Sequence, residues 1–133
     1  MEPVIFWERE LETLPREALR AVQLKRFQER MQYVYDRSPM YRRKYDEAGI
    51  LPGDIQTLED ISRVPFTTKE DLQNSQIESP PWGDFLCVPV EEVVRVFQTS
   101  GTTGVPVRVA LNGKDWFEVF YNQFMHFMYG YGI

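Results

Sequence analysis

The chain has 133 residues, of which 43% are hydrophobic and 26% are charged, a balance typical of one globular domain or part of one rather than of a disordered segment. Its 20 acidic and 15 basic residues give a formal net charge of −5, so no general basic field attracts nucleic acid. The single cysteine cannot form an internal disulfide, and the sequence contains neither a secretion signal nor an apolar run long enough to cross a bilayer. We therefore expect a cytoplasmic protein with no nucleic-acid or membrane partner.

The first part of the chain has the pattern of helices. Apolar residues recur three and four positions apart within residues 14–35, with charged and amide side chains between them, which predicts an amphipathic helix. Ser38 can cap the free amides of a second helix, and Pro39 suits a first helical position that needs no N–H. This second helix is expected to end at Gly49.

A third helix is predicted further along. Thr67 and Glu70 have the spacing of a capping box, in which each side chain satisfies a free backbone amide, so a short helix is expected at about residues 68–74. The following Ser-Pro-Pro-Trp-Gly stretch, residues 79–83, predicts a loop because successive prolines remove backbone donors.

The second part of the chain has the pattern of two strands and a helix. Residues 93–97 and 107–110 are rich in β-branched and aromatic side chains and predict strands. Asn112 is a candidate N-cap, with Asp115 in the first turn of a helix expected to run to about Tyr129. The predicted class is α/β, with residues 1–75 helical, 76–92 rich in loops, and 93–133 forming strand, glycine loop, strand and helix.

The last predicted helix is apolar nearly all round. A helix of this kind is normally buried on several sides, and the strands upstream offer too little surface to cover it. Packing in a small local core explains one of its faces but not both. We therefore expect this helix to contact further polypeptide absent from the sequence, or to cause self-association, since large exposed apolar patches mark contact surfaces. The residues concerned are Trp116, Phe117, Val119, Phe120, Tyr121, Phe124, Met125, Phe127 and Met128.

The loop between the predicted strands carries the most informative run, Thr-Ser-Gly-Thr-Thr-Gly-Val-Pro at residues 99–106. Its glycines allow a sharp turn and close approach of backbone N–H groups to an anion, while the hydroxyls beside them can donate to phosphate oxygens. The run lacks the lysine of a Walker A loop and does not fit the GxGxxG or GxSxG patterns. It predicts a polyphosphate-binding loop rather than a plain hairpin turn.

The run resembles the phosphate-binding signature of the adenylate-forming superfamily of acyl-CoA synthetases, adenylation domains and luciferases. Residues 35–50, 58–61 and 64–72 resemble the phenylacetate-CoA ligase family and the related coenzyme F390 synthetases. This resemblance covers essentially the whole chain and implies the amino-terminal part of the AMP-binding large domain of such an enzyme. It also implies which residues bind the phosphates of ATP: Thr99, Ser100, Gly101, Thr102, Thr103 and Gly104.

The resemblance implies an activity for the full-length enzyme. Such ligases use ATP and Mg²⁺ to join a carboxylate, here an aromatic acid similar to phenylacetate, to AMP, and then pass the acyl group to the thiol of coenzyme A. The adenine- and ribose-binding motifs, the magnesium-binding acid and the mobile domain with the catalytic lysine are expected after Ile133. We therefore assign no catalytic residue and no metal ligand within the chain, and we expect the 133 residues alone to be inactive.

One position departs from the family pattern. Relatives commonly carry a lysine beside the proline of the loop, whereas here Val105 and Val107 flank Pro106, and the nearest cation is Arg108. A lysine would add charge-assisted hydrogen bonds to the phosphates. Two alternatives to the ligase therefore stay open: a non-catalytic binding or interaction module that retains the fold, and a coenzyme F390 synthetase-like AMP ligase.

Several other polar or aromatic residues are interpreted as structural. His126 has no acidic or nucleophilic partner visible in the sequence, and Cys87 has no second metal ligand near it. Tyr41 and Tyr45 lie one helical turn apart and are expected to pack rather than to stack on bases. The charged pairs and triplets at residues 91–92 and 69–71 are expected to be solvated.

Overall fold

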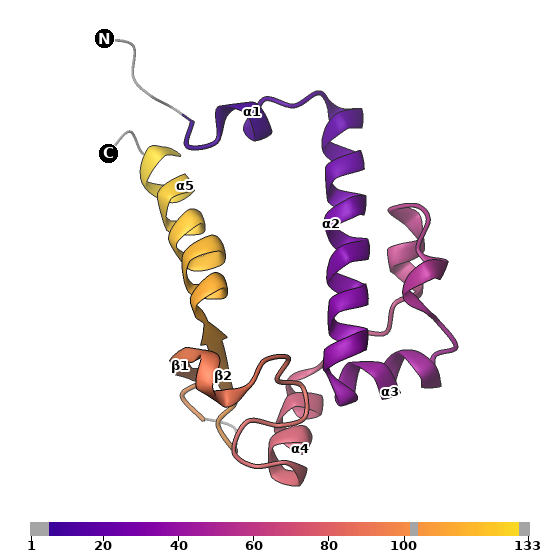
Figure 1. Cartoon of the computed structure of the whole chain (residues 1–133), viewed down its shortest axis with the longest axis vertical. Coiled ribbons are helices and arrows are strands. Elements are labelled where there is room, and N and C mark those ends of the chain that lie inside the picture. Colours follow the sequence, from indigo (N-terminus) through magenta and orange to yellow (C-terminus); the bar gives the residue numbers. More distant parts are fainter. Residues whose placement is uncertain (1–5, 102–103, 131–133) are drawn as a thin grey trace.

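The computed structural model describes residues 6–101 and 104–130. The long helix α2 and the last helix of the chain stand on opposite sides of the molecule in Figure 1, with the short helix α1 near one end and the strands and α4 near the other. The α-helices before the strands are α1 (Arg9–Glu12), α2 (Arg16–Arg37), α3 (Pro39–Glu47) and α4 (Lys69–Glu78). Short 3-10 turns lie between them at Pro52–Asp54 and Glu59–Arg63, and a third, Val90–Glu92, precedes the strands.

Helices α2 and α3 confirm the prediction for the first part of the chain. The amphipathic helix ends two residues later than expected, and the Ser38 hydroxyl oxygen accepts a hydrogen bond from the Tyr41 N–H at 3.3 Å, as its capping role requires. Helix α3 ends just before Gly49, whose φ of 63° is the left-handed conformation that favours glycine at a helix end. The apolar faces of the two helices and the turn after them enclose the main core, which is formed by Met31, Tyr45, Ile50 and Ile55.

The capping box at the start of α4 lies one residue later than predicted. The Thr68 hydroxyl oxygen accepts from the Asp71 N–H at 3.1 Å, and the Asp71 carboxylate accepts from the Thr68 N–H at 2.7 Å. The prediction of Thr67 and Glu70 was therefore wrong, since a second threonine and acid stand beside them with the same spacing and make the capping hydrogen bonds. The helix also extends four residues further than predicted, to Glu78.

The two predicted strands form an antiparallel hairpin. Strand β1 (Val93–Gln98) pairs with β2 (Arg108–Asn112), and the register places Gln98 opposite Arg108. A register shift between Val93 and Arg95 interrupts the ladder at the far end of β1 from the loop. The hairpin therefore presents the glycine-containing loop at one of its ends.

The last helix begins where predicted but has an unexpected form. The Asn112 side chain accepts from the Asp115 N–H at 2.8 Å, which confirms the predicted cap. A seven-residue π-helical segment, Asp115–Tyr121, follows and continues into α5 (Asn122–Gly130). A π-helical segment is not foreseeable from the 3.6-residue period, since its hydrogen bonds span five residues rather than four.

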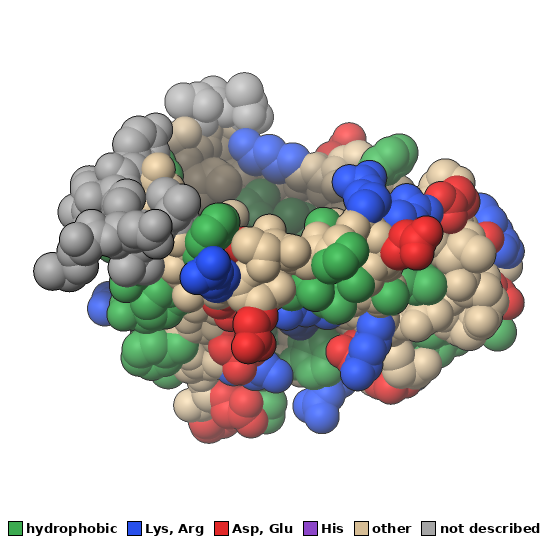
Figure 2. Space-filling view, turned by 90° about the horizontal axis from the view of Figure 1, so that it is seen from above, with side chains coloured by type: hydrophobic (Ala, Val, Ile, Leu, Met, Phe, Trp, Pro, Cys, Tyr) green, Lys and Arg blue, Asp and Glu red, His purple; other side chains and the backbone are tan. Residues whose placement is uncertain are grey.

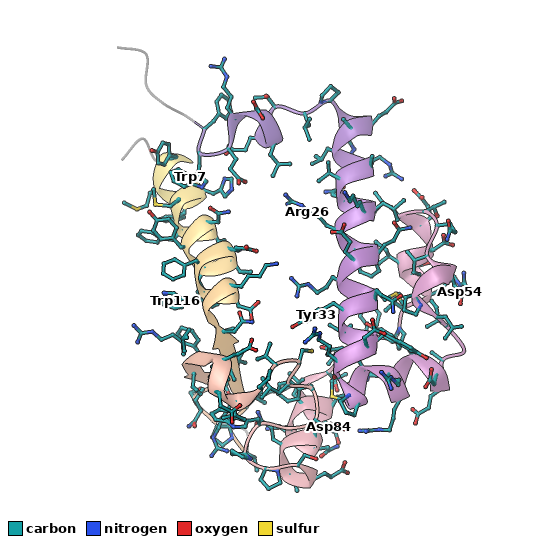
Figure 3. All side chains as sticks on the ribbon, viewed as in Figure 1. Trp7, Arg26, Tyr33, Asp54, Asp84 and Trp116 are labelled. Atoms are coloured by element: carbon teal, nitrogen blue, oxygen red, sulfur yellow. The ribbon has the colours of Figure 1, made fainter. Side chains whose placement is uncertain are left out.

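The segment that contains α1 contacts α5. The Trp7 indole N–H donates to the Asn122 side-chain oxygen at 2.8 Å, and the Trp7 ring lies 5.2 Å from that of Tyr129 between centroids. Figure 3 shows Trp7 close to α5, while Arg26 and Tyr33 point from α2 toward the last helix. Among the described residues, no helix is long and apolar enough to span a membrane.

Candidate phosphate-binding site

The ends of the glycine-containing loop are fixed by a short backbone ladder. The Thr99 N–H donates to the Val107 carbonyl at 3.0 Å, and the Val107 N–H donates to the Thr99 side-chain oxygen at 3.0 Å. Val107 is buried, with 2% of its surface exposed, so the limb that returns from the loop is fixed by packing as well. Because the Thr99 oxygen accepts this bond, the hydrogen of its hydroxyl is available to donate outward.

The two glycines of the loop occupy conformations that favour glycine. Gly101 has a φ of 69° and Gly104 a φ of 132°, and the Gly104 N–H donates to the Gly101 carbonyl at 3.1 Å. A Cβ atom on Gly101 would lie 2.9 Å from the Cγ atom of Pro106, closer than real side chains approach. A residue with a side chain at position 101 would therefore be strained and would displace Pro106.

Four of the six predicted phosphate-binding residues can be placed. Thr99 and Ser100 are exposed at the end of the hairpin, and Gly101 and Gly104 form the hydrogen-bonded turn beside them. Thr102 and Thr103 lie outside the described residues. The described part of the loop therefore combines an exposed hydroxyl residue at 100 with a backbone that turns tightly at position 101, an arrangement suited to anions.

Two glutamines of α4 hold the returning limb of the loop, and sequence analysis did not single them out. The Gln76 side-chain amide accepts from the Arg108 N–H at 3.1 Å and donates to the Arg108 carbonyl at 2.6 Å. The Gln73 amide donates to the Val105 carbonyl. The sequence offers a weak signal for this pair, namely two amide side chains three residues apart on one helical face.

Asp84 fastens α4 to α3 on the opposite side of the helix from the loop. Its carboxylate accepts from the Ser75 hydroxyl at 2.7 Å and forms an ion pair with Arg43 at 2.5 Å, and its backbone carbonyl accepts from the Ser38 hydroxyl at 3.2 Å. Burial is the largest influence on the pKa of Asp84 and raises it, but the hydrogen bonds from Arg43 and Ser75 outweigh burial and hold the pKa below its usual range. The lowered pKa favours the ionised carboxylate, and Asp84 joins two helices, α3 and α4.

Sequence analysis expected the charges at residues 69–71 to be solvated, but one of them, Asp71, is not fully so. Asp71 caps α4 and also forms an ion pair with Lys44 of α3, and the hydrogen bond from Lys44 lowers the pKa of Asp71. This contact at the start of α4 and the Asp84 cluster at Ser75 connect α4 to α3. The helix that carries Gln73 and Gln76 is therefore attached to the main core.

Arg108, the cation nearest to the loop in sequence, points elsewhere. Its guanidinium donates to the Pro81 carbonyl at 3.4 Å, and within residues 6–101 and 104–130 it makes no hydrogen bond to the loop. This contact therefore does not support the idea that Arg108 replaces the lysine of relatives. Acidic and basic side chains are interspersed on the face shown in Figure 2, in agreement with the absence of a general basic field.

The residues interpreted as structural lie away from the loop. Tyr41 and Tyr45 pack together with 6.0 Å between ring centroids, which confirms their packing role. His126 lies 3.4 Å from the Glu8 carboxylate and 3.1 Å from that of Glu12, partners that the sequence spacing did not reveal. Burial raises the pKa of the Cys87 thiol, which disfavours a reactive thiolate, and no group of metal-ligating side chains occurs in the described part of the chain.

Comparisons with known proteins match this arrangement to one family. A phenylacetate-coenzyme A ligase of Thermus thermophilus is 49% identical over 84% of this chain, and those of Pseudomonas putida and Escherichia coli are 38% and 35% identical over 92% of it. The chain corresponds to an amino-terminal portion of the phenylacetate-CoA ligase family. It spans only 24% to 30% of the length of these ligases. No protein-family model matches the chain.

Solved structures of a related acyl-CoA ligase confirm the fold expected for the family. The crystal structure of a 2-hydroxyisobutyryl-CoA ligase in complex with 2-HIB-AMP and CoA in the thioesterification state matches all of this chain with a TM-score of 0.91 and 39% identity. An open conformation of the same ligase matches it with a TM-score of 0.90 and 36% identity. The matches cover 28% and 30% of those chains, so the structure corresponds to the amino-terminal part of an adenylate-forming CoA ligase.

Proposed function

We propose that residues 1–133 form the amino-terminal part of the AMP-binding large domain of an ATP-dependent acyl-CoA ligase, and that residues 99–104 bind the phosphates of ATP. The observation that carries this proposal is Gly101, which has a left-handed backbone and leaves no room for a Cβ atom beside Pro106. A tight turn of this kind, with exposed hydroxyl residues before it, suits a loop whose backbone amides approach an anion. The acyl-adenylate and CoA bound by the structural relative support the same reaction class.

The described residues fit the phosphate groups of ATP in chemistry. Ser100 offers an exposed hydroxyl donor, and the Thr99 hydroxyl retains its hydrogen for donation. These groups are neutral, so they orient the phosphates rather than neutralise their charge. ATP activates a carboxylate by converting a poor leaving oxide into a good one, and a fixed loop contributes by positioning the reacting groups. The magnesium-binding acid, the adenine site and the catalytic lysine would come from polypeptide other than these 133 residues.

The proposed acid substrate is an aromatic carboxylate similar to phenylacetate, with coenzyme A as the acyl acceptor. The support for this substrate is the name shared by relatives of 35% to 49% identity. A small hydroxy acid is the second candidate, because the 2-hydroxyisobutyryl-CoA ligase is 39% identical over the whole chain. Comparing phenylacetate with 2-hydroxyisobutyrate in the complete polypeptide that carries residues 1–133 distinguishes the two.

The phosphate role is tested by ATP–pyrophosphate exchange in that complete polypeptide. Gly101→Val should lower exchange about 100-fold, because a branched side chain displaces the loop, and Gly104→Val should act in the same direction. Gly53→Val is the matched control, since Gly53 has no positive φ and a Cβ there meets nothing within 4 Å. Near-normal exchange in a folded Gly101→Val protein would count against the phosphate role, and the absence of exchange with any acid would favour the non-catalytic module.

A further inference from the structure

The returning limb of the loop has an exposed strand edge, and one side chain occupies it. In an antiparallel pair, successive residues point their N–H and C=O groups alternately toward the partner strand and away from it. Val107 bonds toward Thr99, so the backbone groups of the next residue, Arg108, face away from β1. Gln76 pairs both of these outward groups with its side-chain amide. It therefore takes the place of a third strand for one residue.

The same helix holds the limb at a second point. Gln73 lies one turn before Gln76 on α4 and donates to the Val105 carbonyl, on the loop side of Pro106. The two amides thus bracket Pro106 and Val107, the residues that contact Gly101 and Thr99 respectively. Gln76 is 5% exposed, so its amide is little shared with solvent, and besides the Arg108 contact it makes only a long hydrogen bond of 3.5 Å to the Trp82 carbonyl among the described residues.

Helix α4, which carries the two glutamines, is itself attached to α3. Asp71 and Ser75 attach the helix to α3 through Lys44 and Asp84, so α4 is fixed to the core independently of the loop. A two-stranded hairpin has little stability of its own. The contacts with α4 therefore add support to the limb that the hairpin alone does not provide.

We propose that Gln76, assisted by Gln73, is a positioning residue that presents the phosphate loop to ATP. This inference rests on the proposed phosphate-binding function. A loop fixed before the ligand arrives loses less conformational entropy on binding, so loss of the amide contacts should weaken ATP binding even when the protein stays folded.

The test measures MgATP affinity in the complete polypeptide that carries residues 1–133, for the unchanged protein and for Gln76→Leu. Loss of both hydrogen bonds to Arg108 should weaken MgATP binding about tenfold. In the same samples, the Arg108 amide hydrogen should exchange with solvent faster, because its acceptor is removed. Gln28→Leu is the matched control. Gln28 lies on α2, and its side-chain amide donates to the Ile55 carbonyl at 2.7 Å rather than to the loop.

The outcomes separate this inference from the proposed function. If Gln76→Leu and Gln28→Leu lose similar thermal stability but only the former loses MgATP affinity, the positioning role stands. Unchanged affinity in Gln76→Leu overturns it and leaves the phosphate-binding function in place. Should the unchanged protein bind no MgATP, both fail, although Arg108 exchange still reports the contact. If Gln76→Leu does not fold, Gln73→Leu decides, because Gln73 is only partly buried and a smaller loss of affinity is expected in the same direction.

Discussion

Helices α2 and α3 are mostly polar and the last helix is mostly apolar, yet only the first pair contributes to a core. Met31 and Tyr45 are 2% and 6% exposed and pack with the turn that follows α3. The π-helical segment and α5 contain no buried residue, and Phe117 and Phe124 are 65% and 56% exposed. The comparison shows that α2 and α3 bury apolar side chains within the described residues, whereas the last helix, which turns polar residues toward α2 and aromatic residues away from it, buries none.

The surroundings of the last helix on its two sides explain why it contributes no buried residue. Toward α2 a cavity of about 590 Å³ separates the two helices, and most of its lining is charged or polar, including Arg26, Arg30 and Glu118. On the opposite side, where Trp116 points away from α2 in Figure 3, Phe97, Trp116 and Phe120 stack on one another with centroids 5.2 to 6.1 Å apart. The aromatic side chains thus contact each other and β1, while several keep a large exposed area.

The largest effect expected from this comparison is self-association of the 133-residue chain through the last helix. Burial of each large apolar side chain is worth about 1.5–3 kcal/mol, so several of them together should drive association at ordinary protein concentrations. Sedimentation at several concentrations, with a dye that reports exposed apolar surface, measures it. The double variant Phe117→Gln, Phe124→Gln should reduce both signals.

Phe66→Gln is the control for this prediction. Phe66 is 92% exposed but lies before α4, away from the last helix, so its replacement should leave association unchanged. A monomer that binds no dye at any concentration would show that the last helix is covered within the chain, and would favour the non-catalytic module.

A second prediction concerns stability. Ile55 is fully buried in the main core, so Ile55→Ala should lower the free energy of unfolding by about 2–5 kcal/mol. Phe117→Ala removes a larger side chain but should change it by less than about 0.5 kcal/mol, because that ring is mostly exposed. Urea denaturation of the two variants measures both values. Equal losses would mean that the last helix is packed as well as the core and would break the comparison.

The pH dependence of stability should separate the same two regions. The folded pKa of Asp84 is depressed, so its contribution is fully present above the unfolded pKa of about 3.9 and is lost as pH falls through the folded value. The free energy of unfolding should therefore differ most between the unchanged protein and Asp84→Asn near neutral pH, and the difference should shrink in acid. Glu118→Gln, on the last helix, removes an exposed pair with Lys114 and should change the free energy of unfolding little. A constant Asp84→Asn difference down to pH 2 would contradict the pairing.

Most elements of the fold could be predicted from the sequence because their signals are local. The 3.6-residue period, the Ser38 and Asn112 caps and the two β-branched runs each depend on neighbours a few residues away, and all are confirmed. What could not be predicted depends on contacts between distant residues: Gln76 with Arg108, Lys44 with Asp71, and His126 with Glu12 lie 27 or more positions apart along the chain. The phosphate role of residues 99–104 stays a prediction.

The smallest expected effect concerns a signal that is local but ambiguous, the cap of α4. Two threonines and two acids stand side by side there, so spacing alone allowed either Thr67 with Glu70 or Thr68 with Asp71, and the hydrogen bonds select the latter. Thr68→Ala should lower the free energy of unfolding by about 1 kcal/mol, the usual loss for an N-cap hydroxyl. Thr67→Ala, which removes an exposed hydroxyl without a cap bond, should change it by less than about 0.5 kcal/mol. Because the Asp71 N–H loses its acceptor, Thr68→Ala should also speed amide exchange at the start of α4, whereas the reverse ranking of the two threonines would restore the box at Thr67.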